Sequence, residues 1–229
     1  MNQVATTGIV LSRLNYGEAD KIITLVTPDH GKIRVMARGV RKIKSKLAGG
    51  IELFSVSNIT YIPGKKDIST LVSSRLQTHF GHIVEEIDRT MVGYEIIKLF
   101  SKATEDECDI EYYELILHAM AYLNDKNIDV TLVNCWFMAQ LLKILGHTPN
   151  IRSNTDGNAL NVEKKYGFDY ADMGFFEQPG GAYTPNHIKM LRLLTAENPE
   201  KLQIIKGIGS VLPSLDQLLK QAIVLCLRS

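Results

Sequence analysis

The residues best suited to bind a ligand form one dense run of positive charge. Like charges packed this closely repel one another unless anions neutralise them, and a phosphate backbone supplies anions in a row. We therefore predict that the run binds nucleic acid, and that two lysines in a later turn extend the track. The alternative is a solvated loop that serves only solubility. The predicted phosphate-binding residues are Arg34, Arg38, Arg41, Lys42, Lys44, Lys46, Lys65 and Lys66.

The first six of these residues fall within thirteen positions. Six neutralised phosphates predict that log affinity for single strands falls with log salt at a slope of about −4. No recognition helix accompanies the run, so we expect little sequence specificity. Tyr16, Phe54 and Tyr61 are aromatic candidates for stacking on bases, although packing in or at the rim of a core is the favoured interpretation of each.

Other kinds of chemistry find little support. The sequence contains no nucleophile elbow, Walker loop, HExxH or GxGxxG, and its six histidines are scattered, so we expect that it is not an enzyme.

The three cysteines, Cys108, Cys135 and Cys226, are widely separated and form no CxxC pair, which favours buried free thiols in a reduced compartment. With no signal peptide and no stretch of about 20 apolar residues, we expect a cytoplasmic location. Residues 206–210 resemble a phosphate-holding hairpin, but an ordinary glycine turn is favoured.

The charge of the chain is divided between its two ends. Residues 1–80 contain twelve Lys or Arg and five Asp or Glu, a net charge of +7, whereas residues 81–229 carry −6. A positive segment suits a polyanion and a negative segment suits other partners. The division predicts a nucleic-acid-binding domain at residues 1–80 followed by a separate domain at residues 81–229.

The basic segment has the pattern of a small β-barrel or sandwich. Short runs rich in β-formers alternate with turn residues such as Gly31 and Pro63-Gly64. In the third run, Ile33, Val35 and Ala37 fall on one face and the basic residues on the other, so the basic face should meet solvent. The predicted strands are residues 7–14, 21–27, 32–38, 54–62 and 68–76.

From residue 83 the apolar period becomes helical. The spacing of Ile83, Ile87, Met91, Tyr94 and Ile97 predicts one buried helix face, with Arg89 on the polar side. A long excursion at about residues 148–184, rich in Asn, Gly, Asp and Tyr, interrupts the helices and suggests a function or the remnant of one. The other predicted helices are residues 111–123, 129–145, 185–195 and 213–227, with a short one before the last.

Several segments together resemble the RecO family of bacterial recombination and repair proteins. Residues 16–25, YGEADKIITL, resemble the family's opening signature and are followed in the family's order by GK at 31–32, ARGVRK at 37–42, GIELF at 50–54, LGHTP at 145–149 and the glycine pair at 180–181. The resemblance is strongest over residues 8–80. The resemblance implies an α+β protein: a five-stranded OB-fold barrel, then an all-α helical domain with a long irregular insertion. It also implies binding of single- and double-stranded DNA, annealing of complementary strands, and loading of recombinase onto strands covered by single-strand-binding protein.

The implied protein partners are RecR and the acidic C-terminal tail of single-strand-binding protein. A pocket for such a tail needs an apolar groove with a Lys or Arg at its lip; Lys98, Lys102 and Lys143 remain equal candidates. Two alternatives stay open. The chain could be an adaptor in which the acidic helical domain makes the main contacts, or an RNA-binding OB protein.

The sequence departs from the family at one cofactor site. Many members hold zinc with two CxxC pairs in the excursion, and the corresponding positions here are about Ser153, Asp156, Thr184 and His187. Structural zinc needs thiolate or imidazole ligands, so we expect no zinc and no other cofactor. Packing among Tyr166, Phe168, Tyr170, Phe175 and Phe176 would then have to hold the excursion together.

Overall fold

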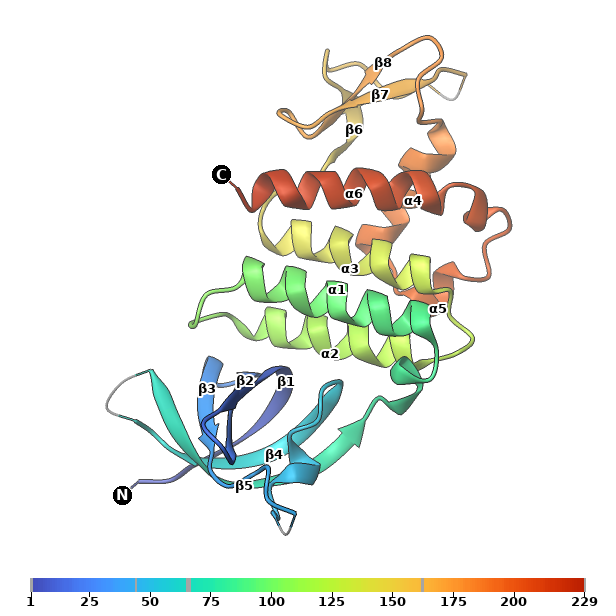
Figure 1. Ribbon diagram of the computed structural model, residues 1–229. Coiled ribbons are helices and arrows are strands. Elements are labelled where there is room, and N and C mark those ends of the chain that lie inside the picture. The colour runs from blue at the N-terminus through green and yellow to red at the C-terminus, as the bar shows by residue number, and fades with distance from the viewer. Residues whose placement is uncertain (1, 44, 65–66, 162, 229) are drawn as a thin grey trace. The chain divides into compact units, whose positions relative to one another are not determined.

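The computed structural model describes residues 2–43, 45–64, 67–161 and 163–228 (Figure 1). The chain divides into two compact units, residues 1–124 and 125–229. The first unit contains a β-barrel with two helices, and the second contains the remaining helices and a small sheet. Within the described residues, no helix is both long and apolar enough to cross a membrane.

Five strands close into a barrel in the order β1-β2-β3-β5-β4. All neighbours are antiparallel except β3 and β5, which pair in parallel over Arg34↔Ile68 to Met36↔Thr70. Every predicted strand overlaps an observed one, so the five-stranded OB-like barrel is confirmed. The strands are β1 (Val4–Tyr16), β2 (Asp20–Thr27), β3 (Gly31–Ala37), β4 (Ser55–Ile62) and β5 (Ile68–His79).

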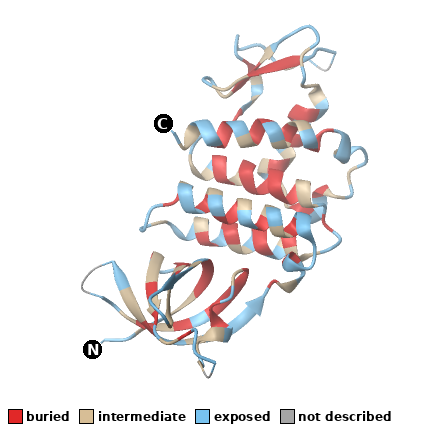
Figure 2. Ribbon diagram, viewed as in Figure 1, coloured by how far each residue is buried: buried red, intermediate tan, exposed pale blue. Residues whose placement is uncertain are grey.

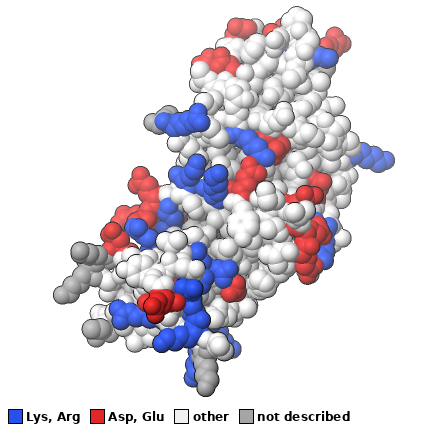
Figure 3. Space-filling model, viewed as in Figure 1, with Lys and Arg blue, Asp and Glu red and all other residues white. Residues whose placement is uncertain are grey.

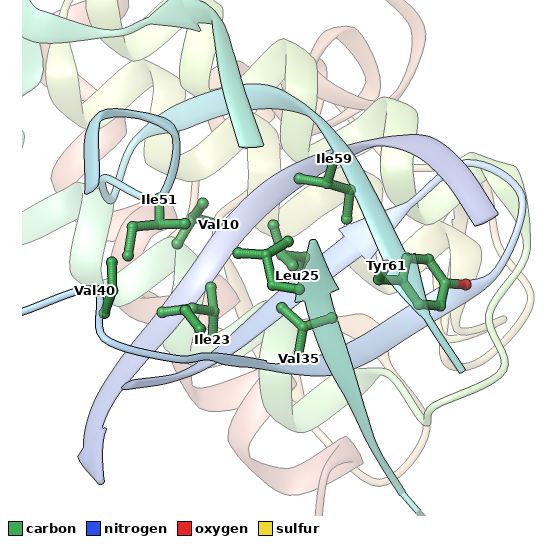
Figure 4. Packing of buried hydrophobic residues seen from close by; sticks show 10 residues of the cluster. Val10, Ile23, Leu25, Val35, Val40, Ile51, Ile59 and Tyr61 are labelled. Carbon is green, nitrogen blue, oxygen red and sulfur yellow. The ribbon is translucent and has the colours of Figure 1, made fainter. Parts of the chain in front are cut away.

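Alternating side chains fill the barrel (Figure 4). Val35 and Ala37 are fully buried and Ile33 packs against the same core, which confirms the predicted inner face of β3. The neighbouring strands contribute Val10, Ile23, Leu25 and Ile59. Because these residues point inward, the intervening residues of β2 and β3 form the outer face of the barrel.

The barrel is followed within the first unit by helices. Gly93 of α1 (Ile87–Ala103) lies against the ring of Phe54: a Cβ there would come within 2.7 Å of it, so the absent side chain lets the helix approach the barrel. The other helical segments of the unit are 3-10 turns η1 (Ala48–Gly50) and η2 (Gly81–Val84) and helix α2 (Ile110–Asn124).

The predicted buried face of α1 is only partly right. Ile83 and Ile97 are buried as predicted, but Ile87, Met91 and Tyr94 are exposed. Beside Ile97, the buried side of the helix carries Gly93, Ile96 and Phe100.

Arg89, placed on the polar side from the sequence, is buried as well. Its Nε donates to Glu86 at 2.9 Å and its Nη1 donates to the carbonyl of Leu123 at 2.8 Å, so the helix turns this cation toward α2. Satisfied polar groups made burial of the arginine tolerable, which apolar spacing alone does not reveal.

The second unit is built around α3 and α6. Helix α3 is buried around much of its circumference, as its apolar composition predicts (Figure 2). Helix α6 buries the predicted stripe that includes Leu215, Leu219 and Ile223. The helical segments are α3 (Val130–Ile144), α4 (Pro185–Ala196), α5 (Pro199–Leu202), η3 (Ile208–Ser210) and α6 (Leu212–Cys226).

The excursion is more regular than the sequence suggested. It contains a three-stranded sheet in the order β6-β8-β7, from β6 (Asn150–Asn154), β7 (Tyr166–Asp169) and β8 (Gly174–Glu177). Phe175 is fully buried at its centre, with ring centroids 6.5 Å from Tyr166, 4.9 Å from Phe168 and 5.7 Å from Tyr183. Aromatic packing therefore holds the sheet, with Tyr183 as a member that the sequence analysis had not included.

Candidate nucleic-acid interface

The outer face of β1, β2 and β3 can be followed strand by strand in the pairing register. Thr24 lies opposite Arg34, and Ile22 lies opposite both Met36 and Leu14. At the end of the strands Tyr16 lies opposite Asp20. In OB folds this face, together with the β1–β2 and β4–β5 loops, is where oligonucleotides bind.

One half of this face is covered by the α1–α2 connection. Lys32 Nζ donates to the carbonyls of Ser101, at 3.2 Å, and Thr104. The Lys32 backbone N–H donates to the carbonyl of Asp106 at 2.8 Å, and the Arg34 guanidinium pairs with the Asp106 carboxylate at 3.3 Å. Although the sequence assigns Arg34 to a phosphate, the structure gives it an acidic neighbour within the same unit.

The other half of the face is open and lies beside the other described residues of the predicted basic run. Arg38, Arg41, Lys42 and Lys46 are all exposed. Figure 3 shows Lys and Arg side chains gathered over the barrel. The structure therefore brings four of the eight predicted residues to one end of the barrel.

Three hydrogen bonds hold the basic loop against the β1–β2 turn. The Arg41 N–H donates to the carbonyl of Ala19 at 2.9 Å, and its Nη1 donates to the carbonyl of Gly17 at 3.2 Å. The Asp20 carboxylate accepts the Gly39 N–H at 2.7 Å. These bonds place the start of the basic loop beside the Tyr16–Asp20 pair, so the charges are positioned rather than free to spread.

Three of the predicted residues, Lys44, Lys65 and Lys66, lie outside the described residues.

The aromatic candidates separate clearly. Phe54 and Tyr61 are buried, at 1% and 5% exposure, and burial raises the pKa of Tyr61. Tyr16 is 54% exposed and Leu14, on the same face, is 64% exposed. Leu14, Ile22 and Met36 were not among the predicted binding residues. The sequence carried a signal for two of them, because Ile22 precedes the core residue Ile23 and Met36 lies between the core residues Val35 and Ala37.

The positions that correspond to the family's zinc ligands are used in other ways. Thr184 and His187 form a capping box at the start of α4, in which the Thr184 N–H donates to His187 Nδ1 at 3.1 Å. Burial lowers the pKa of His187. The Ser153 hydroxyl accepts a bond from Asn150 at 3.1 Å. Two hydroxyls, one carboxylate and an imidazole engaged in a cap do not fit structural zinc, and the described residues contain no cluster of three His, Cys, Asp or Glu able to hold a metal.

The second unit contains a cavity of about 210 Å³ between α4 and the segment that precedes α6. Its wall is polar and apolar in about equal parts: Met190, Leu193 and Ile205 line the apolar part, and the exposed residues Lys189 and Lys206 line the polar part. Lys98, Lys102 and Lys143 do not line this cavity. In the Lys206–Ser210 segment Gly207 has φ of +80°, as a glycine turn requires, and η3 follows it directly.

Comparison with known proteins agrees with this architecture. The chain matches the family model for the recombination protein O N terminal over residues 1–80 and the one for its C terminal over residues 84–225. It is 30% identical over 154 residues to the DNA repair protein RecO of Desulfatibacillum aliphaticivorans, covering 66% of this chain and 60% of the relative. It is 32% identical over 165 residues to the DNA repair protein RecO of Listeria monocytogenes, covering 72% and 62%.

The match thus spans about three fifths of the length of these curated relatives. The two family models together cover most of the chain, in the order of the barrel and then the helices. The resemblance found in residues 16–54 and 145–181 is therefore confirmed, and the chain belongs to the recombination protein O family.

Proposed function

We propose that this protein is a DNA repair and recombination mediator that binds single- and double-stranded DNA through the open half of the barrel face. The observation that carries the proposal is the cluster of four exposed cations, Arg38, Arg41, Lys42 and Lys46, on a loop bonded to the β1–β2 turn. Membership of a family whose relatives are named DNA repair proteins supports it.

Such a surface acts by charge rather than by base sequence. Cations that replace the counterions of phosphates bind any strand, and binding weakens steeply with salt. Two complementary strands held on one neutralised surface repel each other less, which favours annealing. We extend the proposal to loading of recombinase onto strands covered by single-strand-binding protein. Neither annealing nor loading requires the protein to catalyse a reaction. We also propose a cytoplasmic, nucleoid-associated location.

Fluorescence anisotropy with a labelled single-stranded oligomer and its duplex tests the proposal. The variant Arg38→Glu/Arg41→Glu should bind about 100-fold more weakly at low salt, because two cations become anions beside the phosphates. The control is Lys98→Glu/Lys102→Glu, which makes the same charge change at exposed positions of α1 and should shift affinity less than twofold. Thermal melting should show both variants folded.

Equal weakening by both variants would contradict a localised site. Loss of DNA binding with retained partner recruitment and function would favour the adaptor alternative. Preference for a matched RNA oligomer in competition would favour the RNA-binding alternative.

The cavity of the second unit supports a second, separate contact. We propose that it accepts the acidic C-terminal tail of single-strand-binding protein, with the apolar part of the wall, from Met190, Leu193 and Ile205, contacting an apolar side chain and Lys189 and Lys206 facing the carboxylates. Lys189→Glu/Lys206→Glu should weaken binding of a labelled tail peptide about tenfold, whereas Lys143→Glu should not. The opposite result would move the pocket to α3.

RecR is the other partner that family membership supports, and co-elution of the two purified proteins on gel filtration tests it.

We also propose that the protein holds no zinc and needs no cofactor. The capping box of Thr184 and His187 and the aromatic packing around Phe175 supply structure where other members use metal. Elemental analysis of protein purified without chelator should find well below one zinc per chain, and EDTA should leave the melting temperature unchanged. Stoichiometric zinc would overturn this proposal.

A further inference from the structure

An apolar strip crosses the outside of the barrel in its open half. Leu14, Ile22 and Met36 are consecutive partners across β1, β2 and β3, and Tyr16 lies two residues beyond Leu14 on the same side of β1. Their neighbours Ile23 and Val35 are fully buried, so the strip itself faces away from the core. Leu14 is 64% and Tyr16 54% exposed, while Ile22 and Met36 are half-buried.

Folding of the barrel does not explain this strip. Single exposed apolar residues are ordinary, but a contiguous set on a sheet face indicates a binding surface. On the same face nearer the β2–β3 turn, Val26 is fully buried. Within the described part of the chain, the strip is therefore the exposed part of this outer face.

The charges around the strip indicate what it binds. Arg38 directly follows β3, and the bond from the Gly39 N–H to Asp20 brings it beside the Tyr16–Asp20 pair. Arg41 is held on the β1–β2 turn by its bond to Gly17. A ligand lying here meets an apolar surface about 10 Å wide, three strands at roughly 4.8 Å spacing, with cations at one edge. Unpaired nucleobases with their phosphates have this combination, whereas a duplex hides its base faces.

We infer that the strip is a base-stacking platform, with Tyr16 as its aromatic centre and Leu14, Ile22 and Met36 as its apolar floor. The inference rests on the proposed DNA binding and adds to it a preference for unpaired strands. Phosphates bind the basic loop in any DNA, but only a single strand can also place bases on the strip. The β1–β2 hairpin thus distinguishes the two forms of DNA, while the loop after β3 binds both.

Three ligands with the same number of phosphates separate the contribution of base stacking from that of phosphate contacts. They are a single-stranded oligomer, an abasic oligomer and a duplex. The unmodified protein should bind the oligomer about tenfold more tightly than its abasic counterpart, the size expected for one stacked base. Tyr16→Ala should lose that tenfold advantage and leave abasic and duplex binding, and the salt slope, unchanged. Tyr16→Phe should retain it.

Ile87→Ala removes an apolar side chain that is 79% exposed on α1 of the same unit, and it should have no effect on any ligand. Equal binding of the normal and abasic oligomers, unchanged by Tyr16→Ala, would overturn the platform and leave the proposed DNA binding intact. Failure to bind all three ligands would overturn the proposed function, and the platform with it.

Discussion

The two halves of the outer barrel face carry similar residues in different settings. In one half, Lys32 and Arg34 are bonded to the last turn of α1 and to the loop between α1 and α2. In the other, Arg38 and Arg41 extend to solvent beside Tyr16. Strand β3 thus supplies structural cations, and the loop that follows it supplies candidate ligand-binding ones. Charge density along a sequence therefore overstates the charge that a ligand can reach.

The acidic run Glu105-Asp106-Glu107 explains the difference. Its Asp106 meets β3 through both its carbonyl and its carboxylate. It adds negative charge beside Lys32 and Arg34, which lowers the positive potential there. A phosphate backbone should for this reason bind at the opposite end, around the β1–β2 turn.

The largest expected effect is a difference in stability between variants of two glycines with positive φ, one in each half of the face. A Cβ on Gly31 (φ +57°) would meet the Asp106 carbonyl at 2.3 Å, whereas a Cβ on Gly17 (φ +55°) meets nothing within 4 Å. Gly31→Ala should lower the free energy of unfolding by about 4 kcal/mol, from strain plus a clash with backbone, and Gly17→Ala by only about 1 kcal/mol. Urea unfolding measures both; equal losses would show that the loop does not cover β3.

The salt dependence of DNA binding should also differ between Arg34, on β3, and Arg38, directly after it, when each is replaced by a neutral residue. Arg38→Gln should make the slope of log affinity against log salt shallower by about 0.7, the value for one phosphate contact on single strands. Arg34→Gln should leave the slope unchanged because its guanidinium is paired with Asp106. Anisotropy titrations at four salt concentrations give the slopes, and a change in Arg34→Gln as large as in Arg38→Gln would break the distinction.

Removal of the acidic partner should convert part of the covered half into binding surface. In Asp106→Asn the Arg34 side chain, already 42% exposed, loses its counter-charge. We expect roughly threefold tighter binding of single strands at low salt and a slightly steeper slope. The double variant Arg34→Gln/Asp106→Asn is the control, because it lacks the released cation and should return to the original affinity.

The smallest effect is on stability. The Arg34–Asp106 pair joins side chains that are 42% and 68% exposed, so a double-mutant cycle should give a coupling energy of no more than about 0.5 kcal/mol. The cycle is measured by urea unfolding. A coupling above about 2 kcal/mol would mean that the pair, rather than the backbone bonds of Lys32, holds the loop on the barrel.

The barrel could be predicted from the sequence because its signals are local. Period-two alternation in residues 32–38 and the turn residue Gly31 determine which residues extend and where the chain reverses. The buried face of α1 could not be predicted in the same way. Ile87, Met91 and Tyr94 have helical spacing, but Gly93 and Phe100 face the core because the small Gly93 fits against Phe54.

The sequence by itself determined the five strands, the concentration of positive charge before residue 80 and the family of the chain. Each depends on residue type and on spacing along the chain alone. Only the tertiary structure decided which cations are open and which are paired, since Asp106 meets Arg34 across 72 positions. It also brought Leu14, Ile22 and Met36 into one strip, because strand register, unlike alternation within a strand, depends on how separate segments pair.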